Sequence, residues 1–408
     1  MAVLAAESIH GKRRMPLLAL IQLAACVAAC ESSPAPDQGT YLYEYRVPEE
    51  TGDGWETAGL VEVGLSEAPI IRLMEDLHEL EGHEVHSILV VMGGKLVFEE
   101  YFEGRKFNLA QYTGGTGFDR DDTHNLASVT KSFTTTLAGI AIDQGHIESV
   151  HQPVFDFFPE HADLLLDDQR REDMTVEDLL LMQSGISWND LGTYTYDDPR
   201  NDLVRMFTSE DPIRYALSKD LYAHPGTVFD YCNANTNILG EIVSRATGQR
   251  LDRFAQANLF DQLGIVDREW QMLPNDVVFA SGDLRLRPRD MAKFGELFLR
   301  MGMSDGEEVI SREWVEAATE RHVVRLSASH GWADAYGYGW WHWDLPSGGR
   351  IHETYQASGW GGQWIIVIPE HEMVVVSTGG NYYQAEPMPV QRMLEDYVLP
   401  AIQHTPGS

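Results

Sequence analysis

Strand-forming and helix-forming segments are separated along this chain of 408 residues, and their order limits most what it can fold into. Residues 86–104 hold two β-rich runs around Gly93-Gly94, a pattern typical of a hairpin. Helical patterns such as "NTNILGEIVSRATG" dominate residues 150–300, and strand patterns return in "GGQWIIVIPE" and "HEMVVVSTGG". This order predicts one sheet assembled from distant segments, with an all-helical lobe inserted at about 150–290.

Helices are also predicted near both ends of this domain. The segment after Ser66 has apolar residues at helical spacing and stops at Gly82, and a terminal helix is predicted near 388–402. Residues 31–65 are acidic and are predicted to form a linker. The predicted catalytic domain therefore covers 66–408.

The N-terminal 30 residues carry the features of an export signal. The basic "GKRRM" precedes the apolar run "PLLALIQLAACVAAC", which is shorter than the roughly 20 residues of a membrane-spanning helix. Cys26 and Cys30 each follow small residues and resemble the lipidated cysteine of bacterial lipoproteins. Cys30 is preferred because a tether-like, Pro-containing stretch begins directly after it. The prediction is an exported lipoprotein anchored by its lipid and facing the periplasm or exterior, with a plain secreted protein as the alternative.

The net charge argues against a nucleic-acid-binding protein, and the cysteine content argues against a fold held together by disulfides. The formal charge of −33 opposes binding to nucleic acid, whose backbone would repel the chain. Beyond the signal, Cys232 is the one remaining cysteine of the sequence, so no disulfide framework is possible. Buried as a neutral side chain, it is expected to fill space.

Ser128 and Lys131 form an S-x-x-K pair at the start of an apolar helical pattern. Positions i and i+3 share a helix face with Cβ atoms about 5–6 Å apart, so the lysine can reach the serine oxygen. The helix N-terminus favours negative charge and disfavours an ammonium group, which helps the lysine take a proton. The pair is either a nucleophile with its base or the plain first turn of a helix.

Two further stretches favour the catalytic interpretation. Tyr231 and Asn233 form a Y-x-N triplet ahead of a helical pattern, where a tyrosine hydroxyl could shuttle a proton and an amide could hold substrate or steady the lysine. "SGWGGQ" places a Gly-rich turn before an apolar strand, where the backbone can come close to a substrate and offer an N–H to an oxyanion.

The order S-x-x-K, Y-x-N and Gly-rich edge strand resembles the penicillin-recognising serine hydrolases: class C β-lactamases, D,D-peptidases and β-lactamase-like esterases. "DYCNANT" and "SGWGGQ" are most similar to the nylon-oligomer (aminohexanoate-dimer) hydrolases. The resemblance covers about 86–403. It implies the α+β β-lactamase/transpeptidase-like fold, an antiparallel sheet flanked by helices beside an all-helical lobe, with the site between them.

The resemblance also assigns roles. It implies that Ser128 is the nucleophile, Lys131 its base and Tyr231 the proton shuttle. Asn233 orients the substrate, and the oxyanion hole combines the N–H of Ser128 with that of Trp360, which follows Gly359. The third motif departs from the family, because Ala357-Ser358-Gly359 stands where β-lactamases have K-T-G or H-T-G.

The resulting hypothesis is a serine hydrolase that cleaves a small-molecule ester, amide or peptide-like substrate through an acyl-enzyme. The alternatives are a β-lactamase or D-Ala-D-Ala peptidase and a catalytically silent, lipid-anchored sensor. No metal or cofactor is expected, since the histidines of "HELEGHEVH" lack H-E-x-x-H spacing.

Tyr194 and Tyr196 are candidates for a substrate lid. Trp360 and some of the tryptophans at 340, 341 and 343 are candidates for pocket walls. The sequence makes no prediction of oligomeric state.

Overall fold

The computed structural model describes residues 41–408 except 109–110, 191–193, 327–329, 383–385 and 404–408. Within these residues the main sheet has eight strands, in which β1 pairs parallel with β3 and every other neighbour pairs antiparallel. The order across the sheet is β1 (Glu56–Thr57), β3 (Lys95–Tyr101), β2 (Val85–Met92), β17 (Met373–Gly379), β16 (Gln363–Ile368), β15 (Tyr355–Gly359), β12 (Trp341–His342) and β11 (Ala335–Tyr336).

Strands from the two ends of the domain meet at the centre of this sheet. β2 pairs with β17, nearly 300 residues later in the chain, and Val90 lies opposite Val375. The predicted hairpin forms as β2 and β3, with both glycines of the turn at positive φ. The prediction of one sheet built from distant segments is therefore confirmed.

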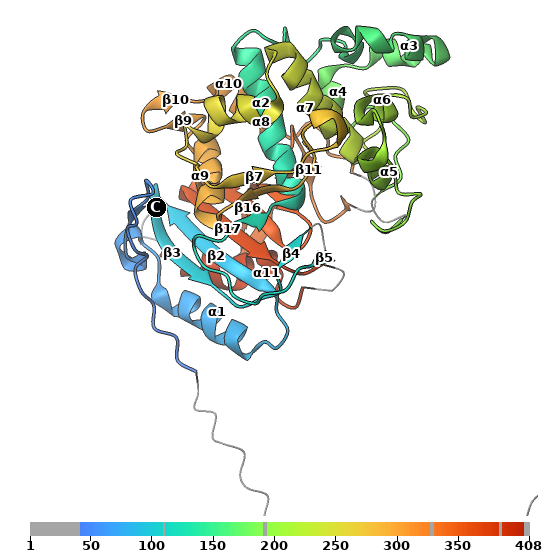
Figure 1. Ribbon diagram of the computed structural model, residues 1–408. Helices are drawn as coiled ribbons and strands as arrows, with labels where there is room; N and C mark the ends of the chain where they lie inside the picture. Colours follow the sequence, from blue (N-terminus) through green and yellow to red (C-terminus); the bar gives the residue numbers. More distant parts are fainter. Residues whose placement is uncertain (1–40, 109–110, 191–193, 327–329, 383–385, 404–408) are drawn as a thin grey trace, which may run out of the picture. The chain divides into compact units, whose positions relative to one another are not determined.

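Both faces of the central strands are buried, which explains their continuous apolar sequences. On β16, Ile365 and Val367 contact one core cluster, whereas Ile366 and Ile368 contact the other. Helices α1 (Glu67–Glu79) and α11 (Val390–Met393), the latter continued by a π turn (Leu394–Val398), cover the second face. Helix α9 (Pro288–Leu299) packs on β16 and β17 from the first face (Figure 1).

The predicted helical lobe lies beyond the first face. Its central helices α2 (Thr130–Asp143) and α7 (Asn233–Thr247) pack against each other (Figure 1). Besides these two helices and α1, α9 and α11, the α-helices of the described residues are α3 (Asp163–Asp167), α4 (Val176–Leu180), α5 (Asp202–Thr208), α6 (Pro212–Leu217), α8 (Leu251–Ala255) and α10 (Arg312–Ala318). The lobe is not helical throughout 150–290, because β7 (Arg268–Trp270) and β8 (Leu284–Leu286) form a small sheet with β6 (His124–Asn125).

Among the described residues, three further pairs of strands, each strand two or three residues long, form two-stranded sheets. They are β4 (Phe107–Asn108) with β5 (Gln111–Tyr112), β9 (Met303–Ser304) with β10 (Glu307–Glu308), and β13 (Leu345–Ser347) with β14 (Arg350–His352).

The predicted linker over 31–65 is wrong for its last part. β1 belongs to the main sheet, and Leu60 and Leu65 are fully buried. The indole of Trp55 is buried as well, and its Nε1–H donates to the carbonyl of Arg289 at 3.2 Å. The acidic residues of this segment are interspersed with apolar anchors, so the folded domain begins before the predicted boundary at 66.

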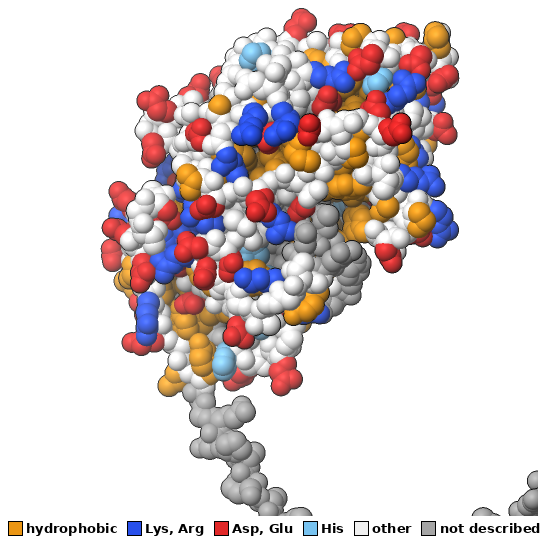
Figure 2. Space-filling view, in the orientation of Figure 1, with side chains coloured by type: hydrophobic (Ala, Val, Ile, Leu, Met, Phe, Trp, Pro, Cys, Tyr) orange, Lys and Arg blue, Asp and Glu red, His pale blue; other side chains and the backbone are white. Residues whose placement is uncertain are grey.

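The predicted signal peptide and Cys30 lie outside the described residues. Among the residues that are described, no helix is long and apolar enough to cross a membrane. Figure 2 shows acidic side chains interspersed with basic ones over the displayed face, consistent with a solvated, acidic surface.

Candidate active site

Ser128 lies in a tight 3-10 turn, η2 (Ala127–Val129), that leads directly into α2. Ala127, just before it, has a positive φ of 45°, a conformation that costs an L-residue about 1–2 kcal/mol. Asn125 supports this turn, because its side-chain oxygen accepts the Ala127 N–H at 2.8 Å and its amide donates to Asp283. The strained turn presents the Ser128 hydroxyl at the N-terminus of a 14-residue helix.

Lys131 reaches Ser128 as the sequence predicted. Its Nζ lies 3.0 Å from Ser128 Oγ and donates to the carbonyl of Ser281 at 2.7 Å. The side chain is fully buried, and burial lowers the pKa of Lys131 to about 7. A large fraction of this amine is therefore uncharged near neutral pH and has a lone pair for the serine proton.

Asp190 opposes this effect of burial, because its charge acts to raise the pKa of Lys131. Burial raises the pKa of the neighbouring Cys232 thiol well above its usual range, so this group stays neutral and Asp190 is the anion that acts on the lysine. Sequence reasoning missed Asp190. The expected role of Cys232 as a buried, neutral filler agrees with its surroundings.

Tyr231 completes the cluster. Burial raises the pKa of its phenol, and its hydrogen bond with Ser128 partly offsets that increase. Lys131 Nζ lies 5.1 Å from the centre of the Tyr231 ring. The phenol is therefore protonated at neutral pH, in contact with the serine and next to the amine.

Asn233 lies at the start of α7, but its amide donates to the carboxylate of Asp190. The indole of Trp188 donates to the same carboxylate oxygen at 2.7 Å. Asn237, one turn along α7, bonds to the hydroxyl of Ser281 at 2.9 Å and so supports the carbonyl that holds Lys131. Asn233 thus positions the anion of the cluster, and its predicted contact with substrate stays a prediction.

Gly359 ends β15 directly beside the turn that carries Ser128. A Cβ atom at this position would lie 2.3 Å from the carbonyl oxygen of Leu126 and 3.2 Å from the backbone nitrogen of Ser128. Only glycine fits there, which explains the residue type. β15 is flanked by β16 and β12, so it is not the edge strand that the Gly-rich motif suggested.

Several aromatic side chains lie near Tyr231 and the Gly-rich motif. Trp341 and His330 each lie with their ring centres 5.2–5.3 Å from Tyr231. The Trp360 ring is partly exposed and packs 5.4 Å from the ring of Tyr196, one of the two predicted lid tyrosines. Trp340, by contrast, is fully buried among phenylalanines of the core.

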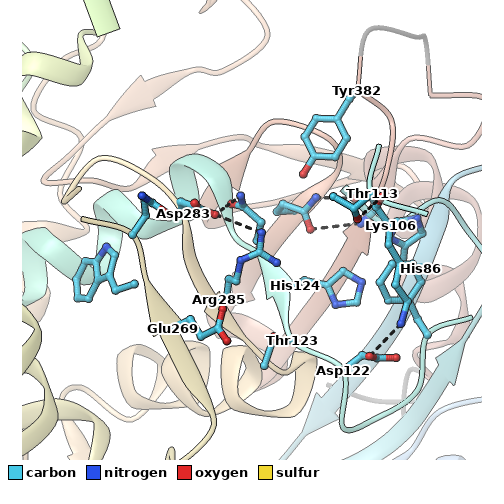
Figure 3. A pocket seen from close by; sticks show the side chains of 16 residues that line it. His86, Lys106, Thr113, Asp122, Thr123, His124, Glu269, Asp283, Arg285 and Tyr382 are labelled. Carbon is cyan, nitrogen blue, oxygen red and sulfur yellow. Dashed lines mark hydrogen bonds and ion pairs between the residues drawn. The ribbon is translucent and has the colours of Figure 1, made fainter. Parts of the chain in front are cut away.

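A cavity of about 390 Å³ lies beside the segment that leads into η2. Figure 3 shows Asp283 and Arg285 on one side of the view, His86 and Lys106 on the other, and His124 between them. Burial lowers the pKa values of both imidazoles, to about 4 for His86, so they are neutral at pH 7. None of the three predicted catalytic side chains is among the described residues that line this cavity.

The comparisons with known proteins agree with this arrangement. The model of the Beta-lactamase family matches residues 71–379, three-quarters of the chain. The chain belongs to the β-lactamase family. It is therefore a serine hydrolase with the β-lactamase/transpeptidase-like fold, as its motif order predicted.

Individual relatives are similar over large parts of the chain. The 6-aminohexanoate-dimer hydrolase of Paenarthrobacter ureafaciens is 29% identical over 296 residues, 67% of this chain and 70% of that protein. The lovastatin esterase of Penicillium rubens is 30% identical over 188 residues, 42% of this chain and 44% of that protein. The class C β-lactamase structure from Rhodobacter sphaeroides shares the fold, with a TM-score of 0.59 and 18% identity over 82% of this chain and 99% of that one.

Proposed function

We propose that this serine hydrolase cleaves a neutral small-molecule ester or amide through an acyl-enzyme on Ser128. The observation that carries the proposal is the 3.0 Å contact between Lys131 Nζ and Ser128 Oγ, held by the carbonyl of Ser281. This contact places a base within hydrogen-bond reach of a nucleophile, and the base is in turn oriented by a third group.

In the proposed acylation, the neutral amine of Lys131 accepts the hydroxyl proton as Ser128 Oγ bonds to the substrate carbonyl carbon. The carbonyl oxygen becomes an oxyanion, for which the N–H groups of Ser128 and Trp360 are the proposed donors. The close approach of Gly359 to the Ser128 backbone supports this pairing, because it brings the third motif beside the nucleophile.

Tyr231 is proposed to pass a proton to the leaving group as the tetrahedral intermediate collapses. Its phenol is protonated at neutral pH and touches the serine oxygen from which the proton departs. The proton that Lys131 took can then return to the phenol. In the second half of the cycle, water attacks the acyl-enzyme and the same groups act in reverse, which releases the acid and regenerates Ser128.

The substrate class follows from the third motif and from the relatives. Ala357 is fully buried and supplies no cation where β-lactamases carry lysine or histidine. A charge-assisted hydrogen bond to a substrate carboxylate is worth roughly 1.5–3 kcal/mol, about one to two decades in binding. Two of the relatives are a 6-aminohexanoate-dimer hydrolase and a lovastatin esterase, which supports linear amides and esters as candidate substrates.

A substrate panel tests this function. The panel contains p-nitrophenyl acetate and butyrate, the 6-aminohexanoate dimer, a D-Ala-D-Ala peptide and nitrocefin, each measured as kcat/KM. We expect multiple turnover with a burst of p-nitrophenol from the neutral esters, and the carboxylate-bearing members of the panel, the dimer included, at least about tenfold below the better ester. Preference for the dimer would contradict the neutral substrate class. Nitrocefin hydrolysis as efficient as ester hydrolysis would favour a β-lactamase. A preference for the D-Ala-D-Ala peptide would favour a peptidase, and acylation without multiple turnover would favour a sensor.

The pH profile offers a second test. Only the neutral form of Lys131 can accept a proton, so kcat/KM should rise with pH through about 7, the pKa of that amine, and then level off. Below this pKa the rate should fall about tenfold per pH unit. Removing the charge that raises this pKa, in Asp190→Asn, should shift the acid limb to lower pH.

Asp198→Asn is the matched control for the pH profile. Like Asp190, Asp198 lies in the connection between α4 and α5, and it pairs with Arg200 at the surface. The pH profile of Asp198→Asn should therefore equal that of the wild type. If the acid limb of the pH profile moved to higher pH in Asp190→Asn, the proposed effect of the Asp190 charge on the pKa of Lys131 would be contradicted.

We propose separately, from the sequence of residues 1–30 alone, that the protein is exported and that Cys30 carries a lipid anchor. Labelling with a fatty-acid analogue in a bacterial host should be lost in Cys30→Ala and kept in Cys26→Ala. The reverse pattern would move the anchor to Cys26, and no labelling would support a secreted protein.

A further inference from the structure

Two histidines and a glutamate converge at the end of the sheet away from the nucleophile. Nε2 of His371 lies 2.9 Å from Oε1 of Glu370 and 3.0 Å from Nδ1 of His352. Nδ1 of His352 also contacts the same Oε1. Three potential ligand atoms therefore form a small triangle.

Hydrogen bonds alone cannot satisfy this triangle while the carboxylate is ionised. If both imidazole nitrogens donate to the shared carboxylate oxygen, two N–H groups face each other across 3.0 Å. If only one of them carries a proton, the other nitrogen directs its lone pair at the carboxylate oxygen. A cation at the centre removes this conflict, because all three atoms then direct a lone pair at it.

The backbone holds the three residues in place. His352 ends β14 and lies opposite Leu345 of β13, and its side chain is buried. Glu370 and His371 lie in the 3-10 turn η9 (Pro369–His371), which starts with proline and is closed by Glu372 at a φ of 46°. The turn links β16 to β17, so the triangle joins the β13–β14 hairpin to the main sheet.

We propose that His352, Glu370 and His371 bind a divalent transition-metal ion, with Zn²⁺ as the best fit, and that water completes a tetrahedral site. Two imidazoles and one carboxylate are a common zinc ligand set, whereas Ca²⁺ and Mg²⁺ prefer oxygen ligands alone. Ligand atoms around tetrahedral zinc lie about 3.3 Å apart, so the two contacts of His371 Nε2 need to lengthen by only a few tenths of an ångström, whereas the closer contact between His352 Nδ1 and Glu370 Oε1 has to lengthen by more.

The surroundings provide an entry path and an outer contact. Glu370 and His371 line an open hollow of about 490 Å³, together with the acidic residues Glu62 and Glu372. The second carboxylate oxygen of Glu370 lies 3.9 Å from the guanidinium of Arg350, which can orient the carboxylate. An ion can therefore reach the site from solvent.

The expected role is structural. β16 runs from Gln363, near the active-site glycines, to Ile368, next to η9, so the two sites lie about 17 Å or more apart at roughly 3.3 Å per residue. The ion would fasten the β13–β14 hairpin to the turn after β16 and would take no part in hydrolysis.

Zinc titration of the untagged, chelator-treated chain tests this proposal. Isothermal titration calorimetry should show one high-affinity Zn²⁺ per chain, no binding of Ca²⁺, and a higher melting temperature with zinc. Co²⁺ should give the visible absorption of a tetrahedral complex. His371→Gln and Glu370→Gln should each weaken zinc binding at least about tenfold and leave kcat/KM for a p-nitrophenyl ester unchanged.

His151→Gln is the matched control, because exposed His151 also pairs with a carboxylate, that of Glu177 at 3.3 Å. It should bind zinc like the wild type. His352→Gln changes a buried side chain and can lower folding yield, so the two variants at the turn decide the outcome. Absence of stoichiometric zinc binding, or binding that persists unchanged in both turn variants, would overturn the proposal.

Discussion

Ser128→Ala should lower kcat/KM for p-nitrophenyl esters by about 10⁴-fold or more and abolish labelling by a fluorophosphonate. The alanine keeps the strained turn and the helix but removes the oxygen that is proposed to form the acyl bond. Residual catalysis would come from the oxyanion hole and substrate binding alone. The measurement is steady-state hydrolysis together with gel-based detection of the labelled protein.

Ser218→Ala is the control for this prediction. Ser218 is exposed at the end of α6, where its hydroxyl donates to the carbonyl of Tyr215 in the same helix. It should keep wild-type activity and labelling. Full labelling of Ser128→Ala would show that another residue is the nucleophile.

Lys131→Met and Lys131→Arg should both lose about 10²–10⁴-fold in kcat/KM, the usual contribution of a positioned general base. Methionine fills much of the space of the buried lysine but offers no lone pair basic enough to take the serine proton. Arginine keeps a positive charge at every accessible pH and cannot accept a proton. The pair therefore separates loss of a base from loss of a cation.

Melting temperatures and a surface variant control for general effects. Lys95→Met removes a partly exposed lysine that pairs loosely with Glu56 at 3.8 Å, and it should behave like the wild type. If Lys131→Arg kept most of its activity, Lys131 would act through its charge and the general base would have to be sought elsewhere.

The sequence predicted the features that depend on local patterns. The apolar run in "GGQWIIVIPE" predicted a strand, and because successive side chains of a strand point to opposite faces, its residues divide between the two cores. The i, i+3 spacing of Ser128 and Lys131 brought their polar atoms together because helix geometry fixes that relation. Gly359 was recognisable because only glycine permits such close backbone approach.

The features that the sequence did not predict depend on tertiary contacts. Asp190 reaches the lysine cluster from a connection 59 residues after Lys131, and a single aspartate in an acidic chain gives no local signal. His352 meets Glu370 and His371 only because β14 folds beside the turn after β16. Scanning for histidine motifs at fixed spacing does not find such a set.

The N-terminal part of the domain was misjudged for a related reason. Acidic composition around Trp55 and Leu60 suggested a linker, but both side chains are buried against the sheet. Burial of a few apolar residues, each worth roughly 1.5–3 kcal/mol, is enough to fix a segment whose other residues are solvated. Composition averages conceal such isolated anchors.

The central claim, an acyl-enzyme on Ser128, is tested most directly by mass spectrometry of the acid-quenched protein during turnover of a slow p-nitrophenyl ester. The intact chain should gain the mass of one acyl group, and proteolysis should locate that group on the peptide containing Ser128. The adduct should disappear as the substrate is consumed. An acyl group on a different residue, or a burst of p-nitrophenol with no covalent adduct, would contradict the account.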